Sequence, residues 1–262
     1  MNQRTPNITA KEQQFVQKVK NALRLGERNT RPVLRKLANT FGITNKTKIK
    51  ELSELAIVMA ARELAHKDLS IKQRYDKIVS LYNRQVNLSF RTSQSVLLQQ
   101  YSTPAPIGFL MGIFCQVDKN RTLFEPSAGN GLLTIAADPK RVVVNEIDLT
   151  RRQNLVAQNY QKVIGQDASV QFIEYLRTFD AVITNPPFGR LSEPVYYSTF
   201  KISELDHLMA LIALDTMRKD GKAAIIIGGH TRWDDKGRIQ KGKQRVFFNY
   251  LYSRYNVADI IA

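Results

Sequence analysis

The chain has 262 residues, and 43% of them are hydrophobic, so a sizeable core can form and a disordered chain is not expected. Its single cysteine, Cys115, excludes a disulfide framework within the chain and is typical of a reducing compartment. The N-terminus has no apolar signal region, and the apolar run that ends at Cys115 is too short to span a bilayer. We therefore expect a cytoplasmic protein with no membrane partner, in which Cys115 is a buried structural thiol.

Positive charge is concentrated in the first third of the chain. The net charge is +16 overall, and residues 1–95 carry 19 Lys/Arg against 7 Asp/Glu, a net of +12. Residues 96–262 carry 20 against 16, a net of only +4. A phosphate backbone attracts such a basic surface, and binding releases the counterions condensed on it. The charge favours a nucleic-acid partner, with a solvated basic helical bundle as the alternative.

The first 90 residues predict helices, because apolar residues recur there at helical spacing. We expect four helices, over residues 10–25, from Thr30 to near Gly42, from a cap at Thr47 through Leu64, and from about Leu69 to Val86. The second and third are separated by a short turn and could form a helix-turn-helix, although a plain helical bundle is the favoured interpretation.

After a polar stretch at residues 86–105, short apolar strands alternate with helices, which is typical of a parallel α/β sheet. The sequence therefore predicts a basic helical domain at 1–95 and a catalytic domain at 96–262, with a doubly wound, Rossmann-like sheet in the second. The expected strands are Thr122–Glu125, Val142–Asn145, Val163–Gly165, Ala181–Thr184, Ala223–Ile227 and Val257–Ile261, and the clearest helices between them are Leu205–Arg218 and Gln244–Tyr255.

The first three strands each end at residues that suit a ligand. The first runs into a loop that contains Gly129 and Gly131, and glycines allow a close approach of the backbone to a ligand. The second ends near Glu146, which is placed to accept hydrogen bonds from ribose hydroxyls, and the third ends near Asp167, within reach of an adenine amino group. Taken singly, the loop is also compatible with a tight turn and each acid with a cap or a surface charge; Asp148 is expected to cap the next helix.

The strongest signal is a buried strand, Ala181–Thr184, that runs directly into the tetrapeptide Asn-Pro-Pro-Phe at residues 185–188. The two prolines stiffen the turn and remove two backbone donors, so the turn is rich in acceptors. The Asn185 side-chain oxygen and the Pro186 carbonyl can accept the two hydrogens of a planar amine, and the ring of Phe188 can stack on its base. A rigid turn with a core phenylalanine is the alternative.

With these motifs in this order, residues 96–262 resemble the N6-adenine DNA methyltransferases, in the arrangement where the cofactor motifs precede the catalytic tetrapeptide. The resemblance implies S-adenosylmethionine as cofactor, no metal, and catalysis by Asn185, Pro186, Pro187 and Phe188. The segment 100–106 resembles the one that closes over the methionine end of the cofactor. The implied cofactor-binding residues are Tyr101, Thr103, Glu125, Ser127, Ala128, Gly129, Gly131, Glu146, Ile147, Asp167, Ala168 and Asn185.

The resemblance further implies methylation of adenine N6 in DNA, after the base is flipped out of the duplex. Adenine in RNA, a protein glutamine, and a non-catalytic nucleic-acid-binding module on the same scaffold are the alternatives. Members of this family continue beyond the last strand expected here and usually carry a separate target-recognition domain. We therefore expect that a C-terminal part is missing from this sequence. The recognition sequence and the oligomeric state are left open.

Two further segments allow two interpretations each. The stretch from Gly189 to Glu204, with three aromatic residues, could close over a flipped base or be a mobile surface loop. The basic stretch from Arg232 to Arg245 could follow phosphates or be a solvated loop. The three histidines, His66, His207 and His230, are scattered along the chain and are expected in the core or on the surface.

Overall fold

The computed structural model describes residues 5–85, 102–229 and 232–261. Its N-terminal part contains the helices α1 (Ala10–Arg24), α2 (Arg31–Thr40), α3 (Lys46–Ala65) and α4 (Ile71–Arg84), close to the four that the sequence predicts. Thr9 and Glu12 form a capping box at the start of α1. The expected cap of α3 at Thr47 is wrong: Asn45 caps this helix, because its side chain accepts the Lys48 amide and so satisfies a donor of the first turn.

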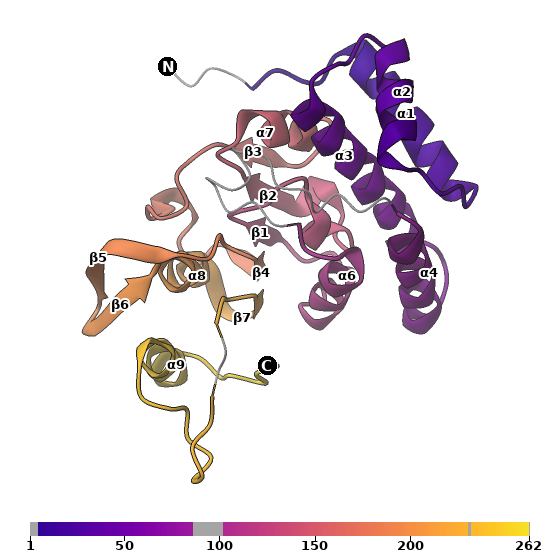
Figure 1. The fold of residues 1–262 in the computed structure, drawn as a ribbon. Coiled ribbons are helices and arrows are strands. Elements are labelled where there is room, and N and C mark those ends of the chain that lie inside the picture. Colours follow the sequence, from indigo (N-terminus) through magenta and orange to yellow (C-terminus); the bar gives the residue numbers. More distant parts are fainter. Residues whose placement is uncertain (1–4, 86–101, 230–231, 262) are drawn as a thin grey trace.

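The second part is built on a five-stranded parallel sheet with the order β3-β2-β1-β4-β7 (Figure 1). The strands are β1 (Leu123–Glu125), β2 (Val142–Asn145), β3 (Lys162–Ile164), β4 (Phe179–Thr184) and β7 (Met217–Ile225). Helices α6 (Ala105–Phe114), α7 (Leu149–Val156) and α8 (Leu205–Asp215) connect or cover them, together with the short 3-10 turns η1 (Leu132–Thr134), η2 (Pro139–Arg141) and η3 (Ile173–Tyr175).

Both faces of this sheet are covered, since alternate residues of one strand belong to different cores. Leu123 and Val144 pack in the core shared with α6 and the N-terminal helices, whereas Phe124 and Val182 pack in a second core with α8. Phe124 is the centre of an aromatic group in the second core, stacked on Phe179 with ring centroids 5.1 Å apart. A parallel sheet covered on both faces is a doubly wound α/β fold, so the predicted fold class is confirmed.

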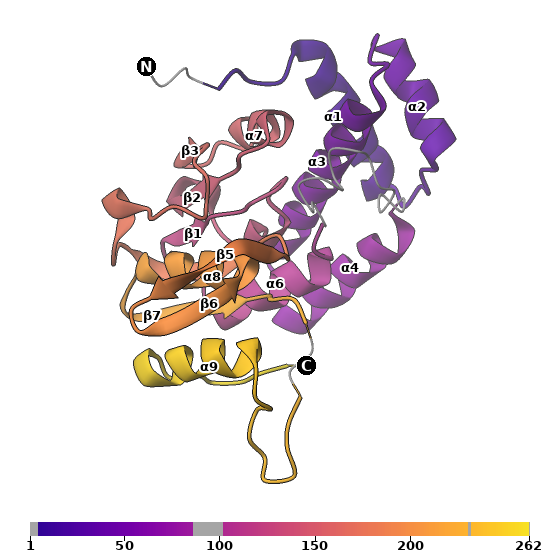
Figure 2. The same ribbon diagram turned by 60° about the vertical axis from the view of Figure 1, so that its left-hand side comes forward.

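Helix α3 lies between helices α1 and α2 on one side and the sheet region on the other, whereas α4 lies beside α6 (Figures 1 and 2). Thirteen of the 20 residues of α3 are buried, and its neighbours include α1, α6 and α7. Its middle, from Ile49 to Val58, has no exposed residue and is packed inside the protein. The bundle interpretation of these helices holds, and one hydrophobic core runs from α1 to the sheet.

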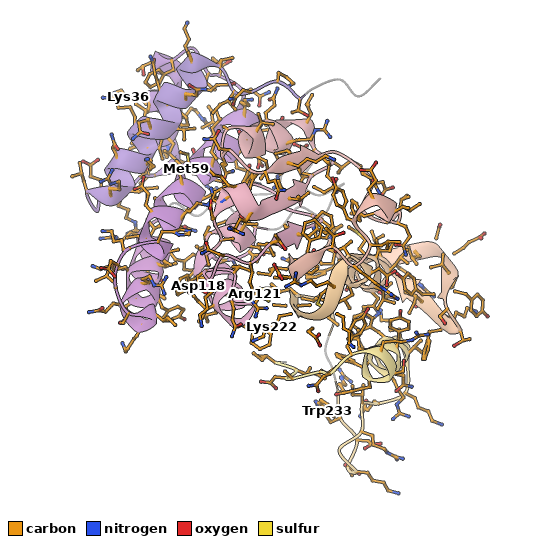
Figure 3. The ribbon with its side chains drawn as sticks, turned by 180° about the vertical axis from the view of Figure 1, so that it is seen from behind. Lys36, Met59, Asp118, Arg121, Lys222 and Trp233 are labelled. Carbon is orange, nitrogen blue, oxygen red and sulfur yellow. The ribbon has the colours of Figure 1, made fainter. Side chains whose placement is uncertain are left out.

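Helix α6 is not among the helices expected from the sequence, although it lies in the apolar run before Cys115. Gly108 and Gly112 allow it to pack closely on η1: a Cβ at Gly108 would lie 2.4 Å from the Leu132 carbonyl oxygen, and one at Gly112 would lie 2.6 Å from the Ala136 Cβ. Cys115, which follows this helix, is fully buried as predicted, and burial raises the pKa of its thiol to about 12 despite the charges of Lys222 and Arg121 on the same side of the molecule (Figure 3).

The segment after the Asn-Pro-Pro-Phe tetrapeptide is an antiparallel hairpin of β5 (Arg190–Tyr197) and β6 (Phe200–Glu204). Tyr197 and Phe200 both pack edge-on against Tyr250 of helix α9 (Lys243–Arg254), with ring centroids 5.6 and 5.4 Å apart. The hairpin is therefore anchored to α9. Tyr197 and Phe200 belong neither to a loop that closes over a base nor to a mobile surface loop. Tyr196, by contrast, is 71% exposed.

The end of the described chain corrects another expectation. Helix α9 agrees with the predicted helix at 244–255, but no strand forms at Val257–Ile261. The run has strand-forming residues, yet most of its side chains stay exposed or half-exposed, and no neighbouring strand pairs with it. Before α9, the segment that includes Trp233 extends away from the sheet (Figure 3). No helix in the described part of the chain is long and apolar enough to cross a membrane.

Candidate active site at the carboxyl edge of the sheet

A cavity of about 280 Å³ lies at the carboxyl ends of β1, β2, β3 and β4. The order of the strands reverses direction between β1 and β4, and such a switch point leaves a crevice where ligands bind in open α/β sheets. Of the predicted site residues, ten line this cavity: Thr103, Ser127, Ala128, Gly129, Glu146, Ile147, Asp167, Ala168, Asn185 and Pro187. Residues far apart in the sequence are thus brought together as the motif order indicated.

The glycine loop after β1 is held by the acid at the end of β2. Gly129 has a φ of 56°, which favours glycine, and its amide donates a 2.8 Å hydrogen bond to Glu146 Oε2. Glu146 Oε1 accepts the Asp148 amide at 2.8 Å, and Asp148 caps α7 as predicted. Burial raises the pKa of Glu146, while the charge of Arg151 and these two hydrogen bonds act in the opposite direction. Glu146 therefore fixes the loop and keeps further lone pairs for a ligand.

Gly131 has a different role from Gly129. Its φ is 95°, and a Cβ at this position would lie 2.4 Å from the Tyr160 hydroxyl oxygen. Gly131 does not line the cavity but allows the turn into η1 to pack under Tyr160. The glycine at position 131 is therefore required by this close packing and by its positive φ, and not by contact with a ligand.

Glu125, at the end of β1, is fully buried beneath the cavity. Its Oε1 accepts the Ser127 amide at 3.2 Å, and the Ser127 hydroxyl lies 2.8 Å from the Thr184 hydroxyl of β4. Its Oε2 is buried and has no hydrogen-bond partner among the described residues. Burial raises the pKa of Glu125 to about 8. Such a carboxyl group gains most from a nearby cation or a hydrogen-bond donor.

Asn185 comes directly after β4 and carries an acceptor that no described residue uses. Its Nδ2 donates to Thr103 Oγ1 at 2.9 Å, which orients the side-chain amide. The Oδ1 that remains is buried and without a partner in the described part of the chain. An unpaired buried acceptor costs about 1–3 kcal/mol. The arrangement is explained if a ligand donates an N–H or O–H group to Asn185 Oδ1.

The rest of the tetrapeptide is arranged unequally. Pro187 lines the cavity, whereas Pro186 is buried beside it. Phe188 is half-buried and does not line the cavity: a Cβ at Gly228 would lie 3.0 Å from its ring, so Phe188 packs against the chain just after β7. Asp167 is exposed at the cavity's rim, where its Oδ1 accepts the amide and hydroxyl of Ser169 at 2.9 and 2.8 Å. Tyr101 lies outside the described residues.

Helix α3 contributes to the lining of the cavity, here called the α3 wall, which the sequence did not indicate. Glu54 lines the cavity, and its neighbour Glu51 accepts Asn130 Nδ2 at 2.7 Å and Arg151 Nε at 2.9 Å. Asn130 belongs to the glycine loop and Arg151 to α7. Glu51 therefore joins three segments of the chain around the cavity. A single acid in a helix belongs to no sequence motif. Glu51 and Glu54 could therefore be identified as site residues only once α3 was known to be buried beside the cavity.

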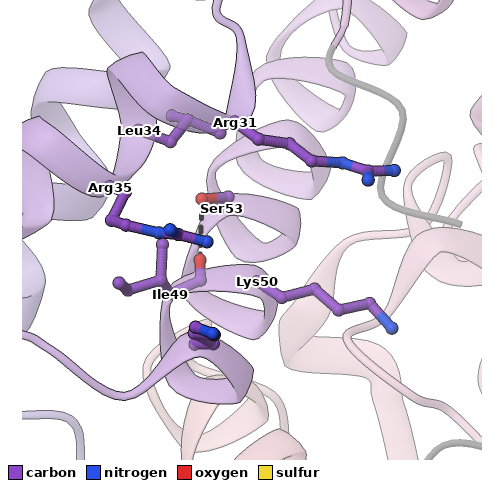
Figure 4. Close-up of a pocket in the computed structure, with 7 residues that line it drawn as sticks. Arg31, Leu34, Arg35, Ile49, Lys50 and Ser53 are labelled. Atoms are coloured by element: carbon purple, nitrogen blue, oxygen red, sulfur yellow. Dashed lines mark hydrogen bonds between the residues drawn. The ribbon is translucent and has the colours of Figure 1, made fainter. Parts of the chain in front are cut away.

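A second cavity, of about 190 Å³, lies between α2 and α3 and is distinctly basic (Figure 4). Its described lining has four basic side chains and no acidic one: Arg31, Leu34, Arg35, Lys46, Ile49, Lys50 and Ser53. Of these, Lys50 also lies 3.8 Å from Glu51. Several basic residues before and within α9 are paired as well: Arg238 and Arg245 with Asp234, and Lys243 with Glu204 at 2.9 Å.

No group of three or more His, Cys, Asp or Glu side chains that could hold a metal ion occurs among the described residues. His207 is buried and stacked on Phe247 with ring centroids 4.4 Å apart, which agrees with its interpretation as a core residue, and burial lowers its pKa. His66 ends α3 as its C-cap. His230 lies outside the described residues.

No protein-family model matches the chain, and no curated protein matches it. Among solved structures, it is similar to a candidate RNA methyltransferase from Pyrococcus horikoshii, at 22% identity and a TM-score of 0.37, over 55% of this chain and 69% of that one. It is also similar to the type IIG restriction endonuclease BpuSI, at 13% identity and a TM-score of 0.46, over 95% of this chain but 31% of that one. A third, TrmN from Thermus thermophilus, has 14% identity and a TM-score of 0.36, with 68% of each chain covered. The chain thus spans about a third of the length of the endonuclease.

Proposed function

We propose that this chain transfers a methyl group from S-adenosylmethionine to the N6 amino group of adenine in DNA. The observation that carries the proposal is the buried Oδ1 of Asn185, an oriented acceptor with no partner among the described residues, in a cavity at the switch point of the sheet. An amino group is the ligand that such an acceptor suits, because it offers N–H donors and leaves its nitrogen free to react.

The described residues suit the cofactor. Glu146 has lone pairs available for two ribose hydroxyls, and Asp167 lies at the end of β3, where an adenine amino group can reach its carboxylate. Gly129 permits a close approach of the loop to the ligand. The unpartnered Oε2 of Glu125 is a buried group whose charged form a cationic ligand above it would favour. When bound, S-adenosylmethionine would supply an electrophilic methyl group on its sulfonium.

The protein's own contribution to the reaction is the placement of the amine. Asn185 Oδ1 would accept one amino hydrogen, and the Pro186 carbonyl, which does not line the present cavity, would accept the other once the base is in place. Both bonds favour a more sp³-like nitrogen, whose lone pair is no longer delocalised into the ring. This interaction strengthens as the transition state forms, so it lowers the barrier and not only the dissociation constant. Thr103 acts on the reaction through Asn185, since its hydroxyl accepts Nδ2 and so aims Oδ1. Phe188 could stack on the base only if it moves from its present contact near Gly228.

A nucleic acid is the proposed substrate because the basic surplus of residues 1–95 includes the cavity between α2 and α3, and DNA is chosen because the motifs resemble those of N6-adenine DNA methyltransferases. Arg35 and Lys46 are exposed on its rim and suit contacts with phosphates. RNA has the same backbone charge and is therefore the alternative substrate. A duplex base would have to be flipped out of the stack, at a cost of a few kcal/mol.

The test is a methyl-transfer assay with labelled S-adenosylmethionine on double-stranded DNA, single-stranded DNA and RNA, followed by digestion to nucleosides. We expect N6-methyladenine in DNA and an about 100- to 1000-fold loss of rate in Asn185→Ala, with cofactor affinity within a few-fold of the wild type. N6-methyladenine found only in RNA would show that RNA, and not DNA, is the substrate. A fully active Asn185→Ala protein would refute the catalytic role of Asn185.

A further inference from the structure

The α3 wall of the cavity contains a carboxyl group that the fold itself does not use fully. Glu54 is buried, with only 4% of its surface exposed, and it lines the cavity together with Ser102 and Thr103. One interaction is with the Ser102 hydroxyl, and its Oε2 is buried without a hydrogen-bond partner among the described residues. A buried carboxylate normally has its oxygens satisfied, so an acceptor left open in a cavity wall indicates a missing donor.

The charges of Arg151 and Lys50 both act on Glu54, and both cations are shared with Glu51. Arg151 donates its Nε to Glu51 at 2.9 Å, and its charge also acts on Glu146. Lys50 lies 3.8 Å from the other oxygen of Glu51. Glu51, Glu54 and Glu146 thus share one guanidinium and one ammonium group near this part of the cavity. Of these three acids, only Glu54 both lines the cavity and has an oxygen with no hydrogen-bond partner among the described residues. The site has room for one more positive charge.

The position of Glu54 selects which part of a ligand it meets. Glu146 and Asp167 mark the ends of β2 and β3, where the proposed function places ribose and adenine. Glu54 is next to Ser102 and Thr103, and Thr103 bonds Asn185 at the end of β4, so Glu54 is on the β1–β4 side of the cavity. A nucleoside that lies over β2 and β3 would extend its tail to this side.

We infer that Glu54, from the N-terminal helical part of the chain, binds the α-ammonium group of the amino-acid tail of the cofactor. The inference rests on the proposed function. It makes α3 a part of the cofactor site and gives the unpartnered Oε2 a charged N–H donor, the kind of hydrogen bond that is strongest in a buried site.

The test measures binding and needs no turnover. S-adenosylhomocysteine carries the amino-acid tail, whereas methylthioadenosine lacks it, and both carry the adenosine. Their affinities are measured by calorimetry at pH 7 for the wild type and for Glu54→Gln. The matched control is Glu63→Gln, because Glu63 is on the same helix but is 41% exposed and pairs with Lys20 away from the cavity.

We expect Glu54→Gln to weaken the binding of S-adenosylhomocysteine by about 10- to 100-fold and to leave the affinity for methylthioadenosine within about twofold of the wild type. Glu63→Gln should change neither affinity. An equal loss for both ligands would show that Glu54 only supports the fold, and unchanged affinities would show that it meets no ligand; either result overturns the inference. A wild-type protein that binds neither ligand would instead refute the proposed function.

A second measurement applies if Glu54→Gln does not fold. The ¹⁵N signal of S-adenosylhomocysteine labelled at its amino group is followed with pH, free and bound to the wild type. An ammonium next to a carboxylate keeps its proton to higher pH, so the bound signal should titrate later than the free one. A bound amine that titrates at the same pH as the free ligand, or earlier, would overturn the inference.

Discussion

The two walls of the cavity are built on different principles. The sheet wall consists of residues that each follow a strand, and its main contacts are backbone amides held by a side chain, as with Gly129 and Glu146. The α3 wall is lined by one buried acid, Glu54, and nearby Glu51 of the same helix joins Asn130 to Arg151. The sheet wall is therefore set by topology, whereas the α3 wall depends on a balance of buried charges.

This difference predicts how each wall fails. A change in the sheet wall should affect one ligand contact at a time, because neighbouring strands still hold the edge. A change in the α3 wall should affect the fold as well, because a buried charge without its partner is costly. Substitutions in the two walls and on the basic surface should separate these outcomes, and the largest effect is expected at Arg151.

Arg151→Met should lower the free energy of unfolding by about 3–5 kcal/mol, since it leaves Glu51 and its neighbours buried without their guanidinium. Urea unfolding at pH 7 measures this, and the loss should shrink as the pH is lowered, because burial raises the pKa of Glu54 and of Glu146 and these groups lose their charge on protonation. Arg24→Met is the control, because Arg24 is 61% exposed in its pair with Glu63. Equal losses of unfolding free energy in both variants would contradict the dependence of the α3 wall on buried charges.

Glu125→Gln should stabilise the protein at alkaline pH. The pKa of Glu125 is raised to about 8, so the folded state binds more protons than the unfolded state between the two pKa values, and stability falls as pH rises through this window. The wild type should lose up to roughly 1.4 kcal/mol per pH unit between about pH 5 and 8 relative to the variant. Thermal unfolding of both proteins across this range measures the effect; parallel curves would contradict the raised pKa.

Glu146→Ala should lower the affinity for S-adenosylhomocysteine and for methylthioadenosine alike, by about tenfold or more. The reason is that Glu146 is placed to accept hydrogen bonds from ribose and also holds the Gly129 amide. Calorimetry with the two ligands sharpens the comparison of the walls, since Glu54→Gln should affect only the ligand with the amino-acid tail. An unchanged affinity for both would remove Glu146 from the ribose site.

Replacing Arg35 and Lys46 together by serine should weaken DNA binding by several-fold. It should also reduce the slope of log K against log salt by up to about 0.9 for each phosphate that is no longer neutralised. The control replaces Arg238 and Lys243, whose charges are paired with Asp234 and Glu204. Fluorescence anisotropy with labelled DNA at several salt concentrations measures both. A larger loss of affinity in the control variant would indicate that DNA binds on the α9 side and not at the cavity between α2 and α3.

Much of the sheet wall could be predicted from the sequence. The bounds of β2 agree with the prediction, and those of β1, β3 and the end of β4 differ by at most a residue, because buried parallel strands are short apolar runs between polar loops. Residues after such strands meet at one edge, so the grouping of Gly129, Glu146, Asp167 and Asn185 follows from the order of the strands.

The rest depended on tertiary contacts. Strand β5 of the hairpin is mostly exposed, and the hairpin is held by Tyr197 and Phe200 against α9, which no local pattern reveals. Val257–Ile261 has the composition of a strand but gains no partner. Glu54 has no motif at all, since a helical acid is normally solvated and becomes a site residue only when its helix is buried against a cavity.

The hydrophobic core shared by the N-terminal helices and one face of the sheet has a practical consequence for producing the protein in pieces. Phe109 of α6 and Leu155 of α7 are fully buried in the same cluster as Leu55 and Ile78 of α3 and α4. A fragment that begins after α4 would expose this apolar face to water, and such patches promote aggregation. Calorimetric heating of the intact chain should accordingly give a single cooperative transition, with no separate melting of the helices.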